Sequence, residues 1–139
     1  MQLIACFFAA VFFSMLMNQP KSTMPVSALI ATAGYGLFLL LGKGVLAYFA
    51  ATVLIGFSCE IAARLMKRTA TLFVTGAIVP LVPGVGLYNT MRYVVEGAYT
   101  KAVSTGVFTL LSICGIALAV TITSVLFSSF AAAIREKRT

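Results

Sequence analysis

The sequence predicts an all-α integral membrane protein, a single transmembrane domain built as a helical bundle, and three observations lead to this fold class. Of the 139 residues, 61% are hydrophobic and only 9% are charged, whereas soluble domains carry about 25% charged residues. The mean hydropathy is +1.08, which implies more apolar surface than a soluble chain of this length buries. The few charged residues also separate uncharged runs close to the ~20 residues that cross a hydrocarbon core as a helix.

Five such runs follow one another, and polar or charged residues bound each of them. The first ends before Asn18-Gln19-Pro20, the second ends at Gly42-Lys43, and the third leads into the basic cluster Arg64, Lys67 and Arg68. The fifth is longer than one span needs, so we expect its beginning to lie at the interface or its helix to tilt. We therefore expect about five transmembrane helices, over residues 2–17, 24–42, 44–65, 69–91 (broken) and 104–130.

The fourth run, 69–91, is expected to be interrupted because it contains prolines and glycines that a continuous helix disfavours. Pro80 and Pro83 lack an N–H and clash with the carbonyl four residues back, so they are expected to free the carbonyls of Gly76 and Val79. Counted from the start of the run at ~1.5 Å per residue, the break lies roughly 16 Å into the membrane. The predicted break at Pro80-Pro83-Gly84 is therefore close to the midplane.

Interrupted helices near the midplane are typical of transporter binding sites, because freed polar groups in lipid must face protein or a wet cavity. On this interpretation the backbone N–H groups from Gly84 to Leu87 bind a substrate carboxylate at a half-helix N-terminus. The alternative is a proline kink that only shapes helix packing. The predicted substrate-binding residues are Pro80, Pro83, Gly84, Val85, Gly86, Tyr88, Asn89 and Arg92.

Two glutamates are candidates for proton coupling. Glu60 lies well within a span, and ionisable residues inside a membrane are functional candidates by default. An ion pair with Arg64, four residues further on, explains Glu60 equally well. Glu96 is spaced by fours from Arg92 and Tyr88, so these three residues share one helix face. That face is either part of the substrate site or an ion pair and a belt tyrosine at the outer interface.

The net charge of +7 comes from ten Lys and Arg residues against three acids. In a membrane protein such an excess indicates the cytoplasmic ends of spans rather than nucleic-acid binding. If the Arg64 cluster faces the cytoplasm, Lys21 and the C-terminal Arg135, Lys137 and Arg138 share that side when the fourth run crosses completely. We expect a multi-pass protein of the inner (plasma) membrane, with the N-terminus outside and the C-terminus in the cytoplasm.

The residue types argue against an enzyme. The chain has no His and no Asp, so neither a Ser-His-Asp nor a Cys-His arrangement is available. The three cysteines, Cys6, Cys59 and Cys114, lack C-x-x-C spacing, which indicates neither a disulfide framework nor a zinc site. We expect no catalytic residue, no metal and no cofactor.

Three segments resemble the threonine/serine exporter family, in particular its short C-terminal membrane module, which also occurs as a separate small subunit. They are Ser58-Cys59-Glu60-Ile61-Ala62-Ala63-Arg64, Ala70-Thr71-Leu72-Phe73 and Ile78-Val79-Pro80-Leu81-Val82-Pro83-Gly84, and Tyr88 follows them. One departure is Thr69, which stands where the family pattern has a proline before Ala-Thr. This departure leaves the start of the fourth helix less rigid.

The resemblance implies export of small carboxylate-bearing metabolites, either amino acids such as threonine and serine or a dicarboxylate such as succinate. It also implies coupling to the proton gradient and a larger partner membrane subunit. One alternative is a structural or assembly subunit of a transporter whose substrate site lies in the partner. A channel-forming homo-oligomer is a further alternative, which the lack of a polar stripe along several spans disfavours.

Overall fold

The computed structural model describes residues 1–42 and 44–136, with side chains up to Ser129, and the described chain is helical with no strand. Lys137 and Arg138, which entered the expected orientation, lie outside the described residues, as do Lys43 and the side chain of Arg135. The all-α prediction is confirmed. The elements are α1 (Gln2–Leu16), α2 (Met24–Leu40), α3 (Val45–Leu65), α4 (Ala70–Ile78), the 3-10 turn η1 (Val79–Leu81), α5 (Gly84–Val95) and α6 (Tyr99–Glu136).

The apolar segments come in the predicted order. Helix α3 has 21 residues, and Tyr99–Ser129 of α6 has 31; each is long and apolar enough to cross a membrane. The stretch Ala70–Leu81 and the helix Gly84–Val95 pass the same test together, as one span bent by 46°. Helices α1 and α2 are apolar but shorter, with 15 and 17 residues. The chain is therefore an all-α membrane bundle in which the fourth segment is broken.

Helices α1 to α4 form the bundle, and small side chains let them approach closely. Gly34 of α2 lies against Ile55 of α3, whose side chain is only 1% exposed. The buried core also contains two large aromatic side chains, Phe38 of α2 and Phe73 of α4. Small residues at helix interfaces are the usual means of close packing in membranes. The buried alanines of this core are Ala10, Ala28, Ala31, Ala47, Ala51, Ala62, Ala63 and Ala77.

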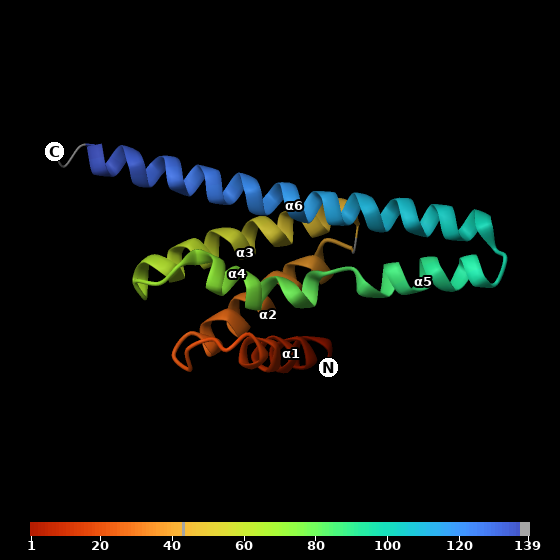
Figure 1. Ribbon diagram of the computed structural model, residues 1–139, viewed down its shortest axis with the longest axis horizontal. Coiled ribbons are helices and arrows are strands. Elements are labelled where there is room, and N and C mark those ends of the chain that lie inside the picture. The colour runs from red at the N-terminus through yellow and green to blue at the C-terminus, as the bar shows by residue number, and fades with distance from the viewer. Residues whose placement is uncertain (43, 137–139) are drawn as a thin grey trace.

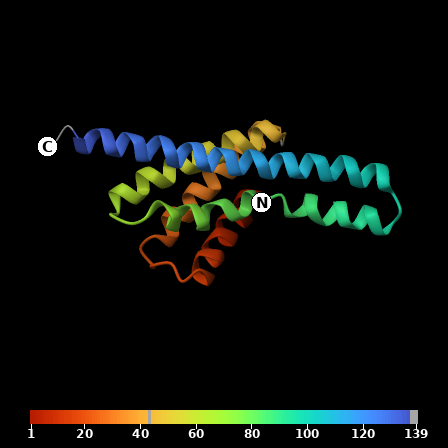
Figure 2. The ribbon, with the colours of Figure 1, turned by 45° about the horizontal axis from the view of Figure 1, so that its top comes forward.

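Helix α5 and the first half of α6 form a hairpin that extends beyond the bundle, whereas the second half of α6 packs on α3 (Figure 1). Figure 2 shows the same hairpin from a second direction. Gly97, at φ +73°, makes the turn between the two helices. Helix α6 thus begins five residues before the expected start at 104 and is about 57 Å long at 1.5 Å per residue. Its pairing with α5 accounts for the earlier start, because α6 begins two residues after the hairpin turn at Gly97 and packs on α5 from there.

The connections alternate between the two ends of the bundle (Figure 1). The α1–α2 connection, which contains Lys21, and the α3–α4 connection, which contains Lys67 and Arg68, lie at the same end as the C-terminus of α6. The N-terminus lies at the opposite end. The basic connections therefore gather at one end of the molecule, as the positive-inside tendency requires.

The break in the fourth segment lies where the sequence predicts it. Helix α4 tightens into η1, then Val82 adopts extended geometry (φ −61°, ψ 126°) and Pro83 precedes the first turn of α5. The N–H of Val82 donates to the carbonyl of Val79 at 3.2 Å. The expectation of a free Val79 carbonyl is therefore wrong, because the 3-10 turn satisfies it locally.

Candidate functional site: a cleft at the helix break

A cleft of about 160 Å³ lies directly at the interruption. The chain from Pro80 to Gly86 forms one wall, with residues of η1, the break and the first turn of α5. Tyr35 and Phe38 of α2 and Tyr48 of α3 form the other wall. The broken backbone is thus not sealed on all sides by aliphatic side chains. We call this hollow the break cleft.

The aromatic wall is ordered by packing between α2 and α3. The ring of Phe38 lies 4.4 Å from that of Tyr48 and 5.9 Å from that of Tyr35, centroid to centroid. Phe38 is buried, and both tyrosines are half-buried. Sequence reasoning missed Tyr35 and Tyr48. The signal that could have found them is a tyrosine inside an apolar run, since its O–H needs a polar partner.

Only part of the expected set of backbone donors is free. The N–H of Gly84 donates to the carbonyl of Val82 at 2.8 Å, and that of Leu87 donates to the carbonyl of Pro83 at 3.2 Å. The expectation of four available donors from Gly84 to Leu87 is therefore wrong. The N–H groups of Val85 and Gly86 precede the first intrahelical bond and have no backbone partner within the described chain.

The structure divides the predicted substrate-binding residues into two groups. Pro80, Pro83, Gly84, Val85 and Gly86 line the break cleft. The others, Tyr88, Asn89 and Arg92, lie further along α5 and do not line it.

Tyr88, Arg92 and Glu96 share one face, as their spacing predicts, and with two apolar neighbours they line a shallow surface depression. Nε of Arg92 lies 2.7 Å from Oε1 of Glu96, so the predicted ion pair is confirmed. These side chains are 57% and 46% exposed. Such an exposed pair contributes little to stability.

The alternative ion pair of Glu60 with Arg64 does not form within the described residues. Arg64 turns instead to α6, where its Nη2 donates to the Phe127 carbonyl at 3.0 Å. The guanidinium carbon also lies 5.0 Å from the centroid of the Phe127 ring. Glu60 is half-buried on α3 and has no ion-pair partner in the part of the chain that the structure describes.

No group of three or more His, Cys, Asp or Glu side chains gathers in a way that could hold a metal ion, as far as the described residues extend. Cys6 and Cys59 are buried and Cys114 is exposed, all three as free thiols. The chemistry of the break cleft is therefore that of neutral hydrogen-bond groups. Val85 and Gly86, whose N–H groups have no backbone partner in the described chain, and the two tyrosines all line this concave space, which has the size of a small polar solute.

The chain matches a known protein family. Residues 2–126 match a family described as "Threonine/Serine exporter, ThrE". The matched range includes all of α1 to α5 and most of α6, and so the whole break cleft. No solved structure matches the chain.

Proposed function

The chain belongs to the threonine/serine exporter family, and on that premise we propose that it is a transport subunit that exports small carboxylate-bearing metabolites through the break cleft. The substrates are amino acids such as threonine and serine, or a dicarboxylate such as succinate. The observation that carries the proposal is the break cleft itself, a space of about 160 Å³ lined by two tyrosines and by two residues whose backbone N–H groups have no backbone partner in the described chain.

In this proposal the substrate carboxylate binds at the N-terminus of α5. The N–H groups of Val85 and Gly86 donate to it, and the partial positive charge of the helix end favours the anion. Tyr35 and Tyr48 line the opposite wall, where a phenol O–H binds a carboxylate or a hydroxyl group. Pro80 and Pro83 support this geometry, because they prevent the helix from closing over the two donors.

The remaining predicted residues belong to the path beyond the break cleft. Tyr88, Asn89 and Arg92 follow on α5, and Arg92 offers a positive charge to a departing anion. We assign proton coupling to Glu60, which is half-buried on α3, ahead of Glu96, which is exposed and engaged by Arg92.

We further propose a larger partner membrane subunit and an orientation with the N-terminus outside and the C-terminus in the cytoplasm. The gathering of Lys21, Lys67 and Arg68 at one end of the bundle supports this orientation. A single-cysteine chain labelled with a membrane-impermeant maleimide tests it. Cysteine at Ser22 is expected to react only in inside-out vesicles, and cysteine at Lys101 only in right-side-out vesicles.

The exposed surface of α5 favours a second candidate function, that of an assembly subunit whose partner contains the substrate site. The hairpin helix α5 has no fully buried residue, and it packs mainly on α6. Tyr88, Met91 and Val95 on its outer side are exposed by 68%, 69% and 88%. A photoreactive threonine analogue separates the two candidates, because it labels this chain if the substrate binds in the break cleft and the partner if it does not.

The direct test of the main proposal is Gly84→Leu. Gly84 lines the break cleft, and a Cβ on Gly84 would meet no atom within 4 Å, so the first atom of the added side chain has room. We expect cells that carry this variant to accumulate threonine, serine or succinate like a deletion strain, with normal amounts of protein in the membrane. Gly44→Leu is the matched control, since a Cβ on Gly44 also meets nothing within 4 Å and Gly44 does not line the cleft. Normal export by Gly84→Leu would contradict the proposal.

A further inference from the structure

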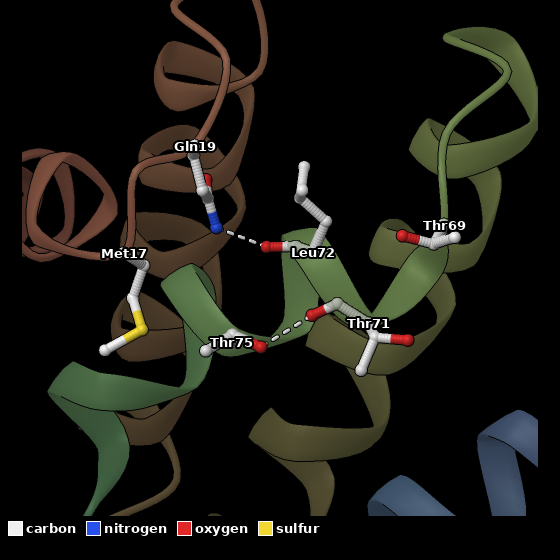
Figure 3. A pocket seen from close by; sticks show the side chains of 6 residues that line it. All are labelled: Met17, Gln19, Thr69, Thr71, Leu72 and Thr75. Carbon is white, nitrogen blue, oxygen red and sulfur yellow. Dashed lines mark hydrogen bonds between the residues drawn. The ribbon is translucent and has the colours of Figure 1, made fainter.

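A second hollow, of about 290 Å³, lies at the other end of α4 (Figure 3). It opens between the α1–α2 connection and the first two turns of α4, at the end of the bundle where the basic connections gather. Most of its lining offers hydroxyl or amide groups and none of it is charged. We call it the α4 cleft, and it is lined by Met17, Gln19, Thr69, Thr71, Leu72 and Thr75.

Gln19 closes the inner side of the α4 cleft. Its side chain is only 5% exposed, and its Nε2 donates to the carbonyl of Leu72 (Figure 3). Its Oε1 accepts a hydrogen bond from the hydroxyl of Ser27, at 3.4 Å. One amide therefore ties the α1–α2 connection and α2 to the first turns of α4.

Behind Gln19, helices α1, α2 and α4 meet at Gly76. A Cβ on Gly76 would lie 2.6 Å from Oγ of Ser14, 3.0 Å from Nε2 of Gln19 and 3.3 Å from Cβ of Ser27. We call these three polar side chains around Gly76 the polar seam. Gly76 directly follows Thr75 of the α4 cleft and precedes Pro80 of the break cleft by four residues, about 6 Å along a helix. Along α4, the polar seam thus lies between the two clefts.

One hydroxyl group of the polar seam, that of Ser14, is buried without a hydrogen bond in the described chain. Ser14 is 0% exposed, and its Oγ has no hydrogen-bond partner among the residues that the structure describes. Buried polar atoms are nearly always paired, and one left unpaired lowers the stability of the conformation that buries it. A solute that passed between α1 and α4 would give Ser14 the partner that it lacks.

We propose that the α4 cleft is a second binding site for the exported solute and that the polar seam is the gate from it to the break cleft. This inference rests on the proposed function. The solute binds first through neutral hydroxyl groups, the bonds of Gln19 to Leu72 and Ser27 open, and Ser14 donates to the solute carboxylate as it passes Gly76. The neutral lining suits a first site, because it holds a zwitterion or a dianion too weakly to trap it.

Ser14→Ala tests the gate with two readouts, measured on the full chain in its native membranes. Loss of an unpaired hydroxyl is expected to raise the thermal unfolding temperature. Loss of its bond to a charged solute is expected to lower kcat/KM for labelled threonine and succinate, taken up by inside-out vesicles, by about tenfold. Higher stability with unchanged uptake would overturn the proposal, as would lower stability, which would show that the hydroxyl is already paired.

Ser112→Ala is the matched control for Ser14→Ala. Ser112 is also 0% exposed, but its hydroxyl donates to the Phe108 carbonyl of its own helix at 2.9 Å, away from both clefts. It is expected to leave uptake unchanged.

Thr71→Val tests the α4 cleft itself. The Thr71 side chain is exposed, so the isosteric change does not disturb the core. We expect KM for the cytoplasmic solute to rise about fivefold, for one neutral hydrogen bond, with kcat retained. The control is Thr121→Val, an exposed threonine of α6. Unchanged KM in Thr71→Val together with failed uptake in Gly84→Leu would overturn this inference and leave the proposed function standing, whereas normal uptake in Gly84→Leu would overturn both.

Discussion

Gly86 of α5 lies directly against Thr109 of α6, and this contact fixes the hairpin to the break cleft. A Cβ on Gly86 would lie 3.2 Å from Cγ2 of Thr109 and closer still to its Oγ1. The Thr109 side chain is 1% exposed, and its hydroxyl donates to the Thr105 carbonyl at 2.7 Å, which holds its rotamer. The first turn of α5, with its unpaired N–H groups, is therefore positioned by α6 rather than by the bundle.

Gly86→Ala is expected to destabilise the protein by about 1–3 kcal/mol, because the new methyl group has no room beside a stiff threonine. Thermal unfolding in detergent measures the change. Gly84→Ala is the control, since its Cβ would meet nothing within 4 Å, and we expect it to leave the unfolding temperature unchanged.

The double variant Gly86→Ala/Thr109→Ala checks the cause. Thr109→Ala removes Oγ1 and Cγ2 and leaves its Cβ 3.4 Å from the added methyl group, an ordinary contact. The double variant is expected to be more stable than the sum of the single changes implies. Strict additivity would show that crowding against Thr109 is not the reason for the loss.

Gly34→Ala tests the packing that holds the aromatic wall of the break cleft. The Cβ would lie 2.5 Å from Cδ1 of the buried Ile55, so either the Ile55 side chain changes its rotamer or α2 moves away from α3. We expect a loss of about 1–3 kcal/mol in unfolding free energy and weaker export, because Tyr35 is the next residue on α2. Two positions along, Gly36→Ala should be neutral in both assays, since its Cβ meets only Leu3, at 3.7 Å.

Local features of this fold were predictable from the sequence, whereas features that depend on contacts between distant helices were not. The break was predictable because Pro80 and Pro83 act on their own helix, whatever packs around them. Tyr35 and Tyr48 were not, because α2 and α3 bring them to the break cleft from positions far away in the sequence. The start of α6 at Tyr99, before the expected residue 104, was missed for the same reason, because it depends on the contact between α6 and α5.

Finer errors came from backbone geometry that residue types do not encode. A tight turn from Val82 to Gly84 takes up the Gly84 N–H, and η1 takes up the Val79 carbonyl, so fewer polar groups are free than the prolines alone imply. The spacing of four predicted the pair of Arg92 with Glu96, which formed. The same spacing allowed Glu60 with Arg64, which did not form in the described chain, because Arg64 reaches Phe127 on α6.

Arg64→Lys is expected to destabilise the α3–α6 contact while keeping the positive charge at this end of the bundle. Lysine lacks the planar guanidinium that donates to the Phe127 carbonyl and lies over its ring. We expect a loss of about 1 kcal/mol, since the site is exposed. Unfolding free energies of Arg64→Lys, Phe127→Leu and the double variant measure the coupling, and a coupling of zero would contradict this account.

Glu60→Gln tests proton coupling, since glutamine keeps the shape of the side chain and removes its proton equilibrium. If Glu60 carries the coupled proton, an imposed pH gradient no longer drives uptake of labelled threonine or succinate into inside-out vesicles, whereas exchange of labelled for unlabelled solute continues. Glu96→Gln distinguishes the second candidate. Because Glu96 is exposed and engaged by Arg92, we expect that variant to respond to the gradient and to change stability by less than about 1 kcal/mol. If the pH gradient still drives uptake in Glu60→Gln but not in Glu96→Gln, the coupled proton binds to Glu96 instead. Glu96 follows the last residue of α5, outside the bundle that holds the break cleft.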